Sequence, residues 1–337
     1  MGILHAPVDA VERRFGERLG KPVRLVDRKI AGEGLSDETA IVTVDVEGEG
    51  ERKLVVRLFR PGAMARHEVD PQRLHQLLVA LTDTPVPVPT PLWYDPDASV
   101  FGQPYTVVSW VPGAALVQWS PEGRAFLAEA GQGPIGEDFC RILAEIHAVD
   151  RTTADLGFLP APEPGTAFAE AEIDRLEDYL RRVADEPEPI VVDGIGWLRA
   201  NIPPTERIAL IHGDYRTGNL LFDDERISAV IDWEFARLGD PLYDLGWVCC
   251  PSNRMDSDLV CMLLPLEDFL ARYQRYAGRT VTKEALHFWI TFHQVRHAIM
   301  WLDAGRAVAD TGDLRLARMY YTMPTMRAMV ADCLEYA

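Results

Sequence analysis

The pattern of hydrophobic residues changes near residue 112, and this change constrains the fold more than any other feature. Between residues 23 and 59, β-branched and polar residues alternate in VRLVDRKIA, AIVTVDVEG and KLVVRLF, with Gly-containing turns between them. Such alternation predicts an antiparallel meander of strands. Beyond Pro112-Gly113, helical periodicity dominates, for example in EDFCRILAEIHAVD and LEDFLARYQRYAG. The sequence therefore predicts a small β-rich lobe followed by a larger, mainly helical lobe.

Local signals refine this division. Residues 1–20 predict a short amphipathic helix, and residues 66–81 predict a second helix with Pro71 near its start. The stretch TPVPVPTP at 84–91 is too rich in proline for a helix or a central strand. YTVVSWVPG at 105–113 predicts one more strand and a turn. We place the first lobe at 1–108, a connector at 109–113 and the helical lobe at 114–337.

Length and charge narrow the classes of protein. The 337 residues, 47% of them hydrophobic, allow a large core and predict about two domains. Lys plus Arg number 34 and Asp plus Glu 52, so the net charge is −18. Nucleic-acid binding needs a basic face, and we therefore expect no nucleic-acid partner. The acidic balance would favour cationic partners, but solubility alone also explains it.

Cysteine usage and the N-terminal sequence indicate the compartment. Five cysteines occur without any C-x-x-C spacing, which argues against a disulfide framework or a thiolate zinc site. They are Cys140, Cys249, Cys250, Cys261 and Cys333. The N-terminus lacks the apolar core of a signal peptide, and no run of about 18 apolar residues occurs. We expect a reduced, cytoplasmic protein without a membrane partner, while the oligomeric state is not indicated.

Two motif-like stretches have structural interpretations. GQGPIG at 131–136 fits G-x-G-x-x-G, but a helical pattern precedes it where a dinucleotide fold requires a strand. A loop between two helices is therefore predicted. His293 and His297 share one helical face without the acidic residue of H-E-x-x-H, so we expect packing or surface histidines rather than metal ligands.

The stretch LIHGDYRTGNLLFDDERISAVIDWEF at 210–235 concentrates polar groups between apolar segments. Asp214 and Asn219 are five residues apart, and Asp232 follows thirteen residues later at the end of an apolar strand. This order suits phosphoryl transfer, in which a carboxylate accepts the proton of a hydroxyl and oxygen ligands hold Mg²⁺. A polar hairpin with surface carboxylates is the alternative, but it does not explain why a charge ends an apolar strand.

HGDYRTGN followed by IDWEFARLGDPLYDL resembles the catalytic core of the aminoglycoside phosphotransferase family. Every fixed element of the family pattern is present: H-G-D-x-x-x-x-N, then D-x-E or D-x-D, then G-D-P-x-x-D-L. The resemblance covers the chain from about Ile30 to about Trp301. The wording is closest to a subgroup that includes phosphotransferase domains fused to acyl-CoA dehydrogenases. The resemblance implies an α+β, bilobal, protein-kinase-like fold, with a small β-rich lobe that binds nucleotide and a larger, mainly helical lobe.

The resemblance also implies roles for the polar residues of the 210–235 stretch. It makes Asp214 the catalytic base and makes Asn219 and Asp232 the Mg²⁺ ligands. His212 would brace the loop rather than react, and Glu234 would support the metal or face the substrate.

Three further residues keep other interpretations. Arg216 would contact phosphate or an anionic substrate, with a surface salt bridge as the alternative. Asp240, followed by Pro241, predicts a helix N-cap. Asp244 would tie that helix to the catalytic loop.

The small lobe departs from the family pattern. Where the family has a Lys that pairs with phosphates, KLVVRLF places Arg57, which would hold phosphate with altered geometry. Lys53, on the same strand face, is the weaker candidate. Glu68 is chosen as the carboxylate that pairs with this cation, and Asp70 is its rival.

The turn at 32–39, GEGLSDET, lacks the full kinase glycine pattern. Its backbone N–H groups and the hydroxyls of Ser36 and Thr39 would still donate to phosphates; a β-hairpin turn without a ligand is the alternative. In SWVPG at 109–113, the resemblance implies that the backbone of Ser109 and Val111 reads the nucleotide base.

The function expected from this resemblance is a Mg²⁺-dependent kinase that transfers the γ-phosphoryl group of ATP, with GTP left open. The acceptor is a hydroxyl of a small molecule, either a hydroxylated metabolite or an aminoglycoside-like antibiotic. Residues 114–200 and the last helices would line the acceptor site. The alternative is a nucleotide-binding regulatory module with little or no kinase activity. A metal hydrolase built on His212, Asp214, His293 and His297 is a third hypothesis.

Overall fold

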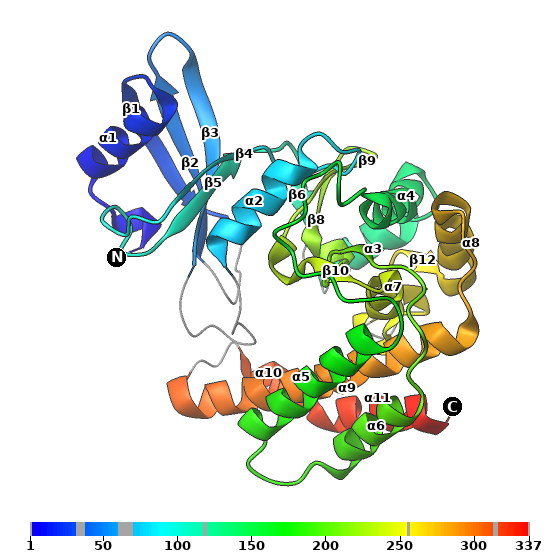
Figure 1. Cartoon of the computed structure of the whole chain (residues 1–337). Coiled ribbons are helices and arrows are strands. Elements are labelled where there is room, and N and C mark those ends of the chain that lie inside the picture. Colours follow the sequence, from blue (N-terminus) through cyan, green and yellow to red (C-terminus); the bar gives the residue numbers. More distant parts are fainter. Residues whose placement is uncertain are drawn as a thin grey trace. The chain divides into compact units, whose positions relative to one another are not determined.

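The computed structural model describes residues 2–31, 38–59, 70–116, 120–254, 257–312 and 316–335. The chain forms two compact units, Met1–Pro112 and Gly113–Ala337, and each is described here by itself (Figure 1). No helix among the described residues combines the length and the apolar character that crossing a membrane requires.

The first unit is built on a five-stranded antiparallel sheet in the order β1-β2-β3-β5-β4. Its strands are β1 (Val23–Ile30), β2 (Glu38–Val46), β3 (Gly50–Leu58), β4 (Pro91–Asp95) and β5 (Tyr105–Ser109). The predicted meander over 23–59 is confirmed as β1, β2 and β3. β4 lies at the edge of the sheet, where a proline such as Pro91 is tolerated because fewer ladder hydrogen bonds are needed.

The core of the first unit lies on one face of this sheet. A short 3₁₀ helix, η1 (Ile3–His5), and α1 (Val8–Leu19) contribute the other side of that core, which includes Phe15. On β3 the inward residues Leu54, Val56 and Leu58 are buried, while the residues between them are more exposed, as strand alternation requires.

Of the helix predicted over 66–81, the structure describes α2 (Pro71–Leu81). The Asp70 carboxylate caps it by accepting hydrogen bonds from the amides of Gln72 and Arg73, and Pro71 occupies the first helical position. Residues 60–69 lie outside the described part of the chain.

The second unit is mainly helical. Its helices are α3 (Pro121–Ala130), α4 (Pro134–Ala148), α5 (Ala167–Val183), α6 (Pro189–Ala200), α7 (Pro241–Cys249), α8 (Leu266–Ala277), α9 (Lys283–Thr311), α10 (Ala317–Tyr321) and α11 (Met323–Glu335). Its short strands are β6 (Ala114–Ala115), β7 (Ala209–Ile211), β8 (Leu220–Asp223), β9 (Arg226–Val230), β10 (Arg237–Gly239), β11 (Leu259–Val260) and β12 (Leu264–Pro265). Single 3₁₀ turns are η2 (Thr217–Asn219), η3 (Trp233–Phe235) and η4 (Pro251–Asn253).

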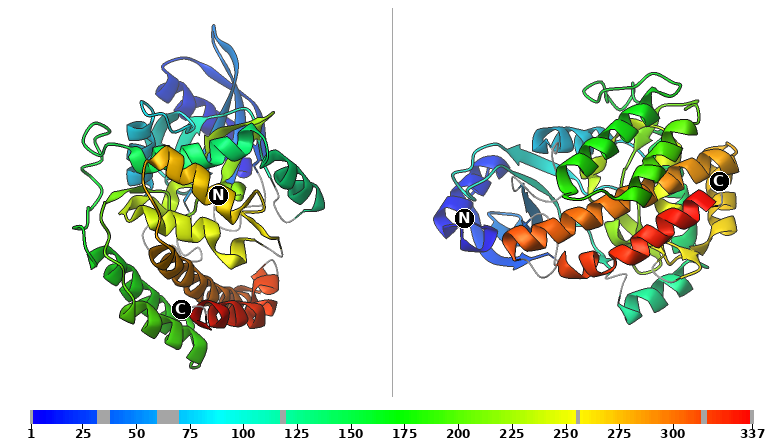
Figure 2. Two further views of the ribbon diagram at one scale, coloured as in Figure 1. Left: turned by 90° about the vertical axis from the view of Figure 1, so that its right-hand side faces the viewer. Right: turned by 90° about the horizontal axis from the view of Figure 1, so that it is seen from below.

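The long helix α9 organises the packing of the second unit. α5, α6, α7 and α11 all contact it, and Figures 1 and 2 show α5, α6 and α11 running beside it. An aromatic cluster fills the contact with α7, where the rings of Tyr243 and Trp289 lie 5.3 Å apart and those of Trp289 and Phe292 also lie 5.3 Å apart. Such edge-to-face contacts stabilise beyond their buried area.

The structure confirms the structural interpretations of GQGPIG at 131–136 and of the pair His293 and His297. The 131–136 stretch joins α3 to α4, and a Cβ on Gly131 would lie 1.8 Å from the carbonyl oxygen of Leu263, so this glycine permits a close backbone approach. His293 and His297 are buried within α9, and burial lowers the pKa of both. His293 Nε2 lies 2.8 Å from the carbonyl oxygen of Tyr243, to which it donates.

Candidate active site

Two short strand pairings position the stretch between residues 209 and 239. β7 pairs antiparallel with β10, and β8 pairs with β9, so the chain leaves β7, forms a hairpin and returns to the edge of β7. The loop 212–216 and η2 lie between β7 and β8, while Asp232 and η3 lie between β9 and β10. Strand ends therefore deliver both clusters of polar residues, as the apolar–polar pattern predicted.

Asp214 and Asn219 are in direct contact. The Asn219 side-chain amide donates from Nδ2 to Asp214 Oδ2 at 2.7 Å and to the Asp214 carbonyl oxygen at 2.8 Å. Asp214 is 9% exposed and Asn219 is 4% exposed. Both contacts engage Nδ2, so they leave the carbonyl Oδ1 of Asn219 available as an oxygen ligand that could bind a cation.

His212 holds the loop that follows β7 through both ring nitrogens. The amide of Asp214 donates to Nδ1 at 3.2 Å, and Nε2 lies 3.0 Å from the carbonyl oxygen of Ile231, to which it donates. Only the neutral Nε2–H tautomer satisfies both contacts. Burial lowers the pKa of His212, which favours this neutral form.

Asp232 stands at the other end of the hairpin. The amide of Ile231 donates to the carbonyl oxygen of Asn219 at 2.9 Å, so the residues that precede β8 and follow β9 are brought together. Asp232 has φ of +67° and ψ of +52°, a left-handed conformation that is uncommon outside glycine. Such strain is frequent at functional sites, and here it sets the direction of the carboxylate at the strand end.

Asp244 ties α7 to the catalytic loop, as predicted. Its Oδ2 accepts from the amide of His212 and its Oδ1 from the amide of Gly213, both at 2.7 Å. His147 Nε2 lies 3.1 Å from Oδ2, and its Nδ1 lies 2.8 Å from the hydroxyl of Tyr273. Burial opposes ionisation of Asp244, but the hydrogen bond and the charge of His147 outweigh it and lower its pKa.

The N-cap prediction for α7 is also confirmed. Asp240 accepts from the amide of Leu242 at 2.9 Å, and Pro241 is the first helical residue. The second carboxylate oxygen of Asp240 accepts from the hydroxyl of Thr205 at 2.9 Å.

Gly213 has a conformational reason to be glycine. Its φ is +83°, and a Cβ at this position would lie 2.5 Å from the carbonyl oxygen of Phe235. Any side chain would therefore push η3 away from the catalytic loop.

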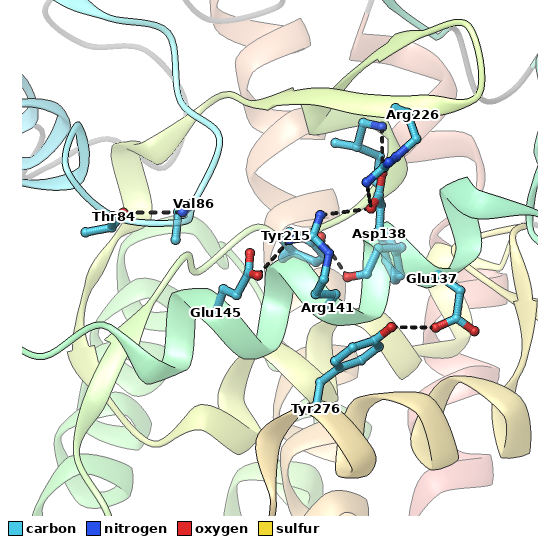
Figure 3. Close-up of polar contacts among 11 residues, drawn as sticks. Thr84, Val86, Glu137, Asp138, Arg141, Glu145, Tyr215, Arg226 and Tyr276 are labelled. Atoms are coloured by element: carbon cyan, nitrogen blue, oxygen red, sulfur yellow. Dashed lines mark hydrogen bonds and ion pairs between the residues drawn. The ribbon is translucent and has the colours of Figure 1, made fainter.

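A buried carboxylate on α4, which no sequence pattern indicated, anchors the hairpin. Asp138 accepts from Arg226 Nε at 2.6 Å and Arg226 Nη2 at 2.7 Å, and from Arg141 Nη2 at 2.8 Å (Figure 3). The amide of Ile227 also donates to it, at 3.3 Å. Burial opposes ionisation, but both arginines outweigh it and lower the pKa of Asp138. The strand β9, which leads toward Asp232, is thus fixed at its start.

Replacing Asp138 with Ala is expected to lower the free energy of unfolding by about 2–3 kcal/mol, because two arginines lose a charge-assisted acceptor. Glu137→Ala is the matched control, since this neighbouring carboxylate binds the exposed Arg275 and Tyr276, and its loss should cost less than about 1 kcal/mol. Denaturant unfolding monitored by tryptophan fluorescence measures both. Equal losses in the two variants would contradict the anchoring role.

Two arginines flank the catalytic stretch. Arg216 donates from Nε to Asp214 Oδ1 at 3.2 Å. Arg237, which the sequence analysis did not single out, forms a two-point ion pair with Glu172 on α5, through Nε at 3.2 Å and Nη2 at 2.8 Å. Glu234 lies in η3 and is half-buried. Arg216 thus forms a salt bridge, as the alternative interpretation expected, and the partner is Asp214, the candidate base.

Two of the predicted nucleotide residues of the first unit, Arg57 and Thr39, lie on the sheet face opposite its core. Arg57 on β3 is in register with Thr39 on β2 and Thr106 on β5. Lys53, two rows along the same face, is exposed, and its ammonium lies 4.7 Å from the centre of the Trp110 ring.

The structure says less about the other residues that were predicted to bind the nucleotide. Ser109 ends β5, and its hydroxyl accepts from the amide of Thr90 at 2.9 Å, while Val111 is half-buried beyond the strand. Ser36 and Glu68 lie outside the described residues. Asp70, the rival of Glu68, uses its carboxylate as the cap of α2.

The described residues offer oxygen ligands rather than a nitrogen or thiolate metal cluster. Within the described ranges, no three His, Cys, Asp or Glu side chains are grouped to hold a metal. Mg²⁺ requires no such protein cage, since it binds one or two carboxylate or amide oxygens together with phosphates and water. Asn219 and Asp232 carry oxygen atoms of this kind and are the residues that could hold Mg²⁺. All five cysteines are buried and unpaired.

The fold and this segment define a kinase-like phosphotransferase architecture. The profile of the APH family, described as the phosphotransferase enzyme family, matches residues 29–289. The chain belongs to this family.

Curated relatives come from multidomain proteins. The chain is 27% identical over 249 residues to acyl-CoA dehydrogenase family member 10 of Mus musculus, covering 72% of the chain and 22% of the relative. It is 26% identical over 323 residues to the probable acyl-CoA dehydrogenase IBR3 of Arabidopsis thaliana, covering 83% and 38%. The chain thus spans well under half of these relatives. The predicted similarity to members linked to acyl-CoA dehydrogenases is confirmed.

Solved structures share the fold over nearly the whole chain. A provisionally assigned aminoglycoside phosphotransferase from Ralstonia eutropha has a TM-score of 0.74 at 23% identity and covers 99% of both chains. A thermostable mutant of aminoglycoside phosphotransferase APH(4)-Ia, in a complex with AMP-PNP and hygromycin B, has a TM-score of 0.63 at 18% identity, covering 95% of this chain and 98% of that one. At these identities the likeness shows the fold, and the predicted protein-kinase-like fold is confirmed.

Proposed function

We propose that this protein is a Mg²⁺-dependent kinase that transfers the γ-phosphoryl group of ATP to a hydroxyl of a small molecule. The observation that carries the proposal is the hydrogen-bonded pair of Asp214 and Asn219 at the foot of a hairpin whose other end presents Asp232. Phosphoryl transfer needs little covalent chemistry from the protein, so positioned charges of this kind are its main requirement.

Asp214 is the proposed base. Asn219 and Arg216 each bind one of its carboxylate oxygens, which fixes the direction of the group. In the reaction, the acceptor oxygen forms a bond to the γ-phosphorus, and its proton passes to the Asp214 carboxylate. The bond between the γ-phosphorus and the bridging oxygen breaks, and ADP leaves. Arg216 would then neutralise charge on the transferring group.

Asn219 Oδ1 and the Asp232 carboxylate are the proposed Mg²⁺ ligands. The bound cation would neutralise the phosphate oxygens during transfer. The protein contributes the orientation: the Asn219 amide is fixed by Asp214, and Asp232 is fixed by its left-handed backbone. His212 keeps the two loops together without exchanging a proton, because its neutral tautomer is required by both contacts.

The nucleotide is proposed to bind to the sheet face that carries Arg57. Beside it, Ile41, Val55 and Val108 form a half-buried apolar row suited to a planar base. Arg57, paired with Glu68, would bind phosphate, and Ser36 and Thr39 would add donors. The backbone of Ser109 and Val111 would contact the base. One neighbour of the same fold is a complex with AMP-PNP, which supports ATP as the donor, and another is a complex with GDP, so GTP is the alternative donor.

The acceptor class rests on relatives and on the site. One structural neighbour is a complex with hygromycin B, and a curated relative is named viomycin phosphotransferase, with 30% identity over 157 residues. Both support a small-molecule acceptor. A cytoplasmic location, where ATP is abundant and buried thiols stay reduced, belongs to the same proposal.

Isothermal calorimetry with ATP tests the proposal first. Binding should weaken about tenfold or more when Mg²⁺ is removed or when Asp232 is replaced by Asn, because two phosphates lose their counter-charge. An ATP-consumption screen over aminoglycosides, sugars, amino alcohols and hydroxy acids then identifies the acceptor. Mg²⁺-dependent binding without consumption for every acceptor would favour the regulatory module instead. ATP binding that does not change when Mg²⁺ is removed would contradict both the kinase function and the regulatory module.

A further inference from the structure

A small cavity lies where the ends of α4 and α8 meet the start of α7. It encloses about 40 Å³, and its lining includes His147 on α4, Tyr273 on α8, Pro241 on α7 and the arginines Arg207 and Arg279. α4 and α8 pack against each other and form two of its walls (Figure 1). A cavity needs roughly 10–15 Å³ to hold one water, so this one has room for about three water-sized groups. The oxygen-bearing end of a small anion is of that size.

The two arginines of this cavity have little to bind within the protein. Arg207 lies two residues before β7 and forms no hydrogen bond or ion pair among the described residues. Arg279 follows α8, and its nearest ion-pair contact is 3.7 Å from Glu206 Oε2, on a side chain that is 83% exposed. An exposed pair of this kind contributes little free energy.

Both guanidinium groups act on the same part of the cavity wall. Burial raises the pKa of the Tyr273 hydroxyl, and the positive charges of Arg279 and Arg207 oppose that rise. Two like charges that line one cavity repel each other. An anion between them would replace this repulsion with two attractive contacts.

Other groups around the cavity are already engaged. The hydroxyl of Tyr276, which also lines the cavity, donates to Glu137 Oε2 at 2.8 Å (Figure 3). The carboxylate of Asp240, the residue before Pro241, accepts from the amide of Leu242 at 2.9 Å. Neither carboxylate can turn to the arginines without losing these hydrogen bonds. The arginines therefore require a partner from solution.

A chain of hydrogen bonds connects the cavity wall to the loop after β7. The hydroxyl of Tyr273 lies 2.8 Å from His147 Nδ1, and Nε2 of the same ring lies 3.1 Å from Asp244 Oδ2. Asp244 accepts from the amides of His212 and Gly213, both at 2.7 Å. Tyr273 and His147 are both buried. A ligand that stabilises these two side chains also stabilises the acceptor of the loop amides.

We propose that this cavity binds a phosphate group between Arg207 and Arg279, and that the bound group stabilises the loop after β7 through His147 and Asp244. A guanidinium binds phosphate through two parallel N–H donors, and a doubly charged group gains more from two arginines than a carboxylate does. Free inorganic phosphate and the phosphate end of a small metabolite share this chemistry. The site is distinct from the proposed Mg²⁺ site, and the assignment does not depend on the kinase function.

Isothermal calorimetry with sodium phosphate at constant ionic strength tests the binding. Mg²⁺ and AMP-PNP are present in excess, so that the proposed nucleotide site is filled. We expect one phosphate per chain, and Arg207→Met and Arg279→Met should each weaken its binding about tenfold or more. Arg275→Met is the matched control, because this exposed arginine on α8 binds Glu137 at 2.6 Å; it should change the affinity less than about twofold.

Two further ligands identify the source of the phosphate. Tighter binding of glycerol 3-phosphate than of inorganic phosphate would indicate a metabolite, and equal or weaker binding would indicate the free ion. Acetate is the carboxylate arm and should bind more weakly than either. Acetate binding as tight as that of phosphate would contradict the phosphate assignment.

Amide hydrogen exchange, read by mass spectrometry, tests the connection to the loop. At a phosphate concentration about ten times its Kd, exchange in the peptide that carries His212 and Gly213 should slow by up to about elevenfold, the limit set by mass action. The double variant of Arg207→Met and Arg279→Met should show no slowing.

Three results would overturn the assignment. The wild-type protein could show no binding of phosphate or glycerol 3-phosphate, or the double variant could bind phosphate as tightly as wild type. Phosphate binding without slower exchange in the loop peptide would remove the connection to Asp244. The Mg²⁺-dependent binding of ATP decides the kinase function separately, since the phosphate titration requires neither an acceptor nor turnover.

Discussion

Replacing Asp214 with Asn is expected to lower kcat by about 10²- to 10⁴-fold, the range associated with loss of a general base. The fold should persist, because an Asn at this position still offers Asn219 a side-chain acceptor and keeps the backbone amide that binds His212. Affinity for Mg²⁺-ATP should change little. Steady-state kinetics with the acceptor found by screening, together with nucleotide titration, measures both quantities.

Asp223→Asn is the matched control for this change. Asp223 lies at the exposed end of β8, in the same 26-residue stretch as the base, and the substitution removes the same charge. It should leave kcat within about twofold, since surface substitutions away from special features have small effects. Wild-type turnover by Asp214→Asn, with Asp223→Asn also active, would remove Asp214 from the proposed mechanism.

Replacing Asp244 with Ala is expected to lower the free energy of unfolding by about 3–5 kcal/mol. The carboxylate is fully buried, and its loss leaves the amides of His212 and Gly213 without their acceptor and His147 without its partner. Asp244→Asn should be nearly as harmful. Both carboxylate oxygens accept hydrogen bonds, and an amide can replace only one of them. Chemical denaturation monitored by circular dichroism measures the effect.

Asp193→Ala on α6 is the control, since this carboxylate is exposed and should contribute within about 0.5 kcal/mol. The pH dependence gives a second readout. The pKa of Asp244 is lowered in the folded state, so its contribution is fully present above the pKa of an unfolded carboxyl and is lost as pH falls through the lower folded value. An Asp244→Ala variant as stable as wild type would show that the loop is held by other contacts.

Local patterns were sufficient for much of the fold. Alternation predicted the meander of β1, β2 and β3, and Asp240 with Pro241 predicted the start of α7, because these signals involve neighbours in sequence. The structure begins α2 at Pro71, and residues 66–69 of the predicted helix lie outside the described part of the chain. The carboxylate of Asp70 binds the first amides of that helix, and this cap decides the boundary where periodicity does not.

Long-range ion pairs were not predictable. Asp138 meets Arg226 across 88 residues, and Glu172 meets Arg237 across 65 residues. No periodicity or spacing links such pairs, and each charge taken alone is typical of a solvated helix or strand end. α6 was also not singled out, because its glycines weaken the helical pattern. One of them, Gly194, is needed for close packing, since a Cβ there would lie 2.7 Å from Val295 Cγ2 on α9.

The candidate catalytic segment could be predicted for a different reason. The candidate site residues lie at the ends of short strands that follow one another in the sequence. The sequence spacing of Asp214, Asn219 and Asp232 therefore indicates how near they lie in the fold. The orientation of these side chains could not be predicted from the sequence. The amide of Asn219, the tautomer of His212 and the left-handed backbone of Asp232 are set by contacts that only the structure shows.

Along the hairpin of β8 and β9, the tolerance to substitution is expected to differ between the turn and the two ends. Its turn, Asp224 and Glu225, is exposed, while the ends of the hairpin hold Asn219 and Asp232. Asp138 accepts hydrogen bonds from Arg226 and from the amide of Ile227 directly after the turn, so we expect changes in turn length or charge to have little effect on the ends of the hairpin. Sequence drift at this tip is therefore expected to be nearly neutral, and divergent members of the family should differ more there than at either end of the hairpin.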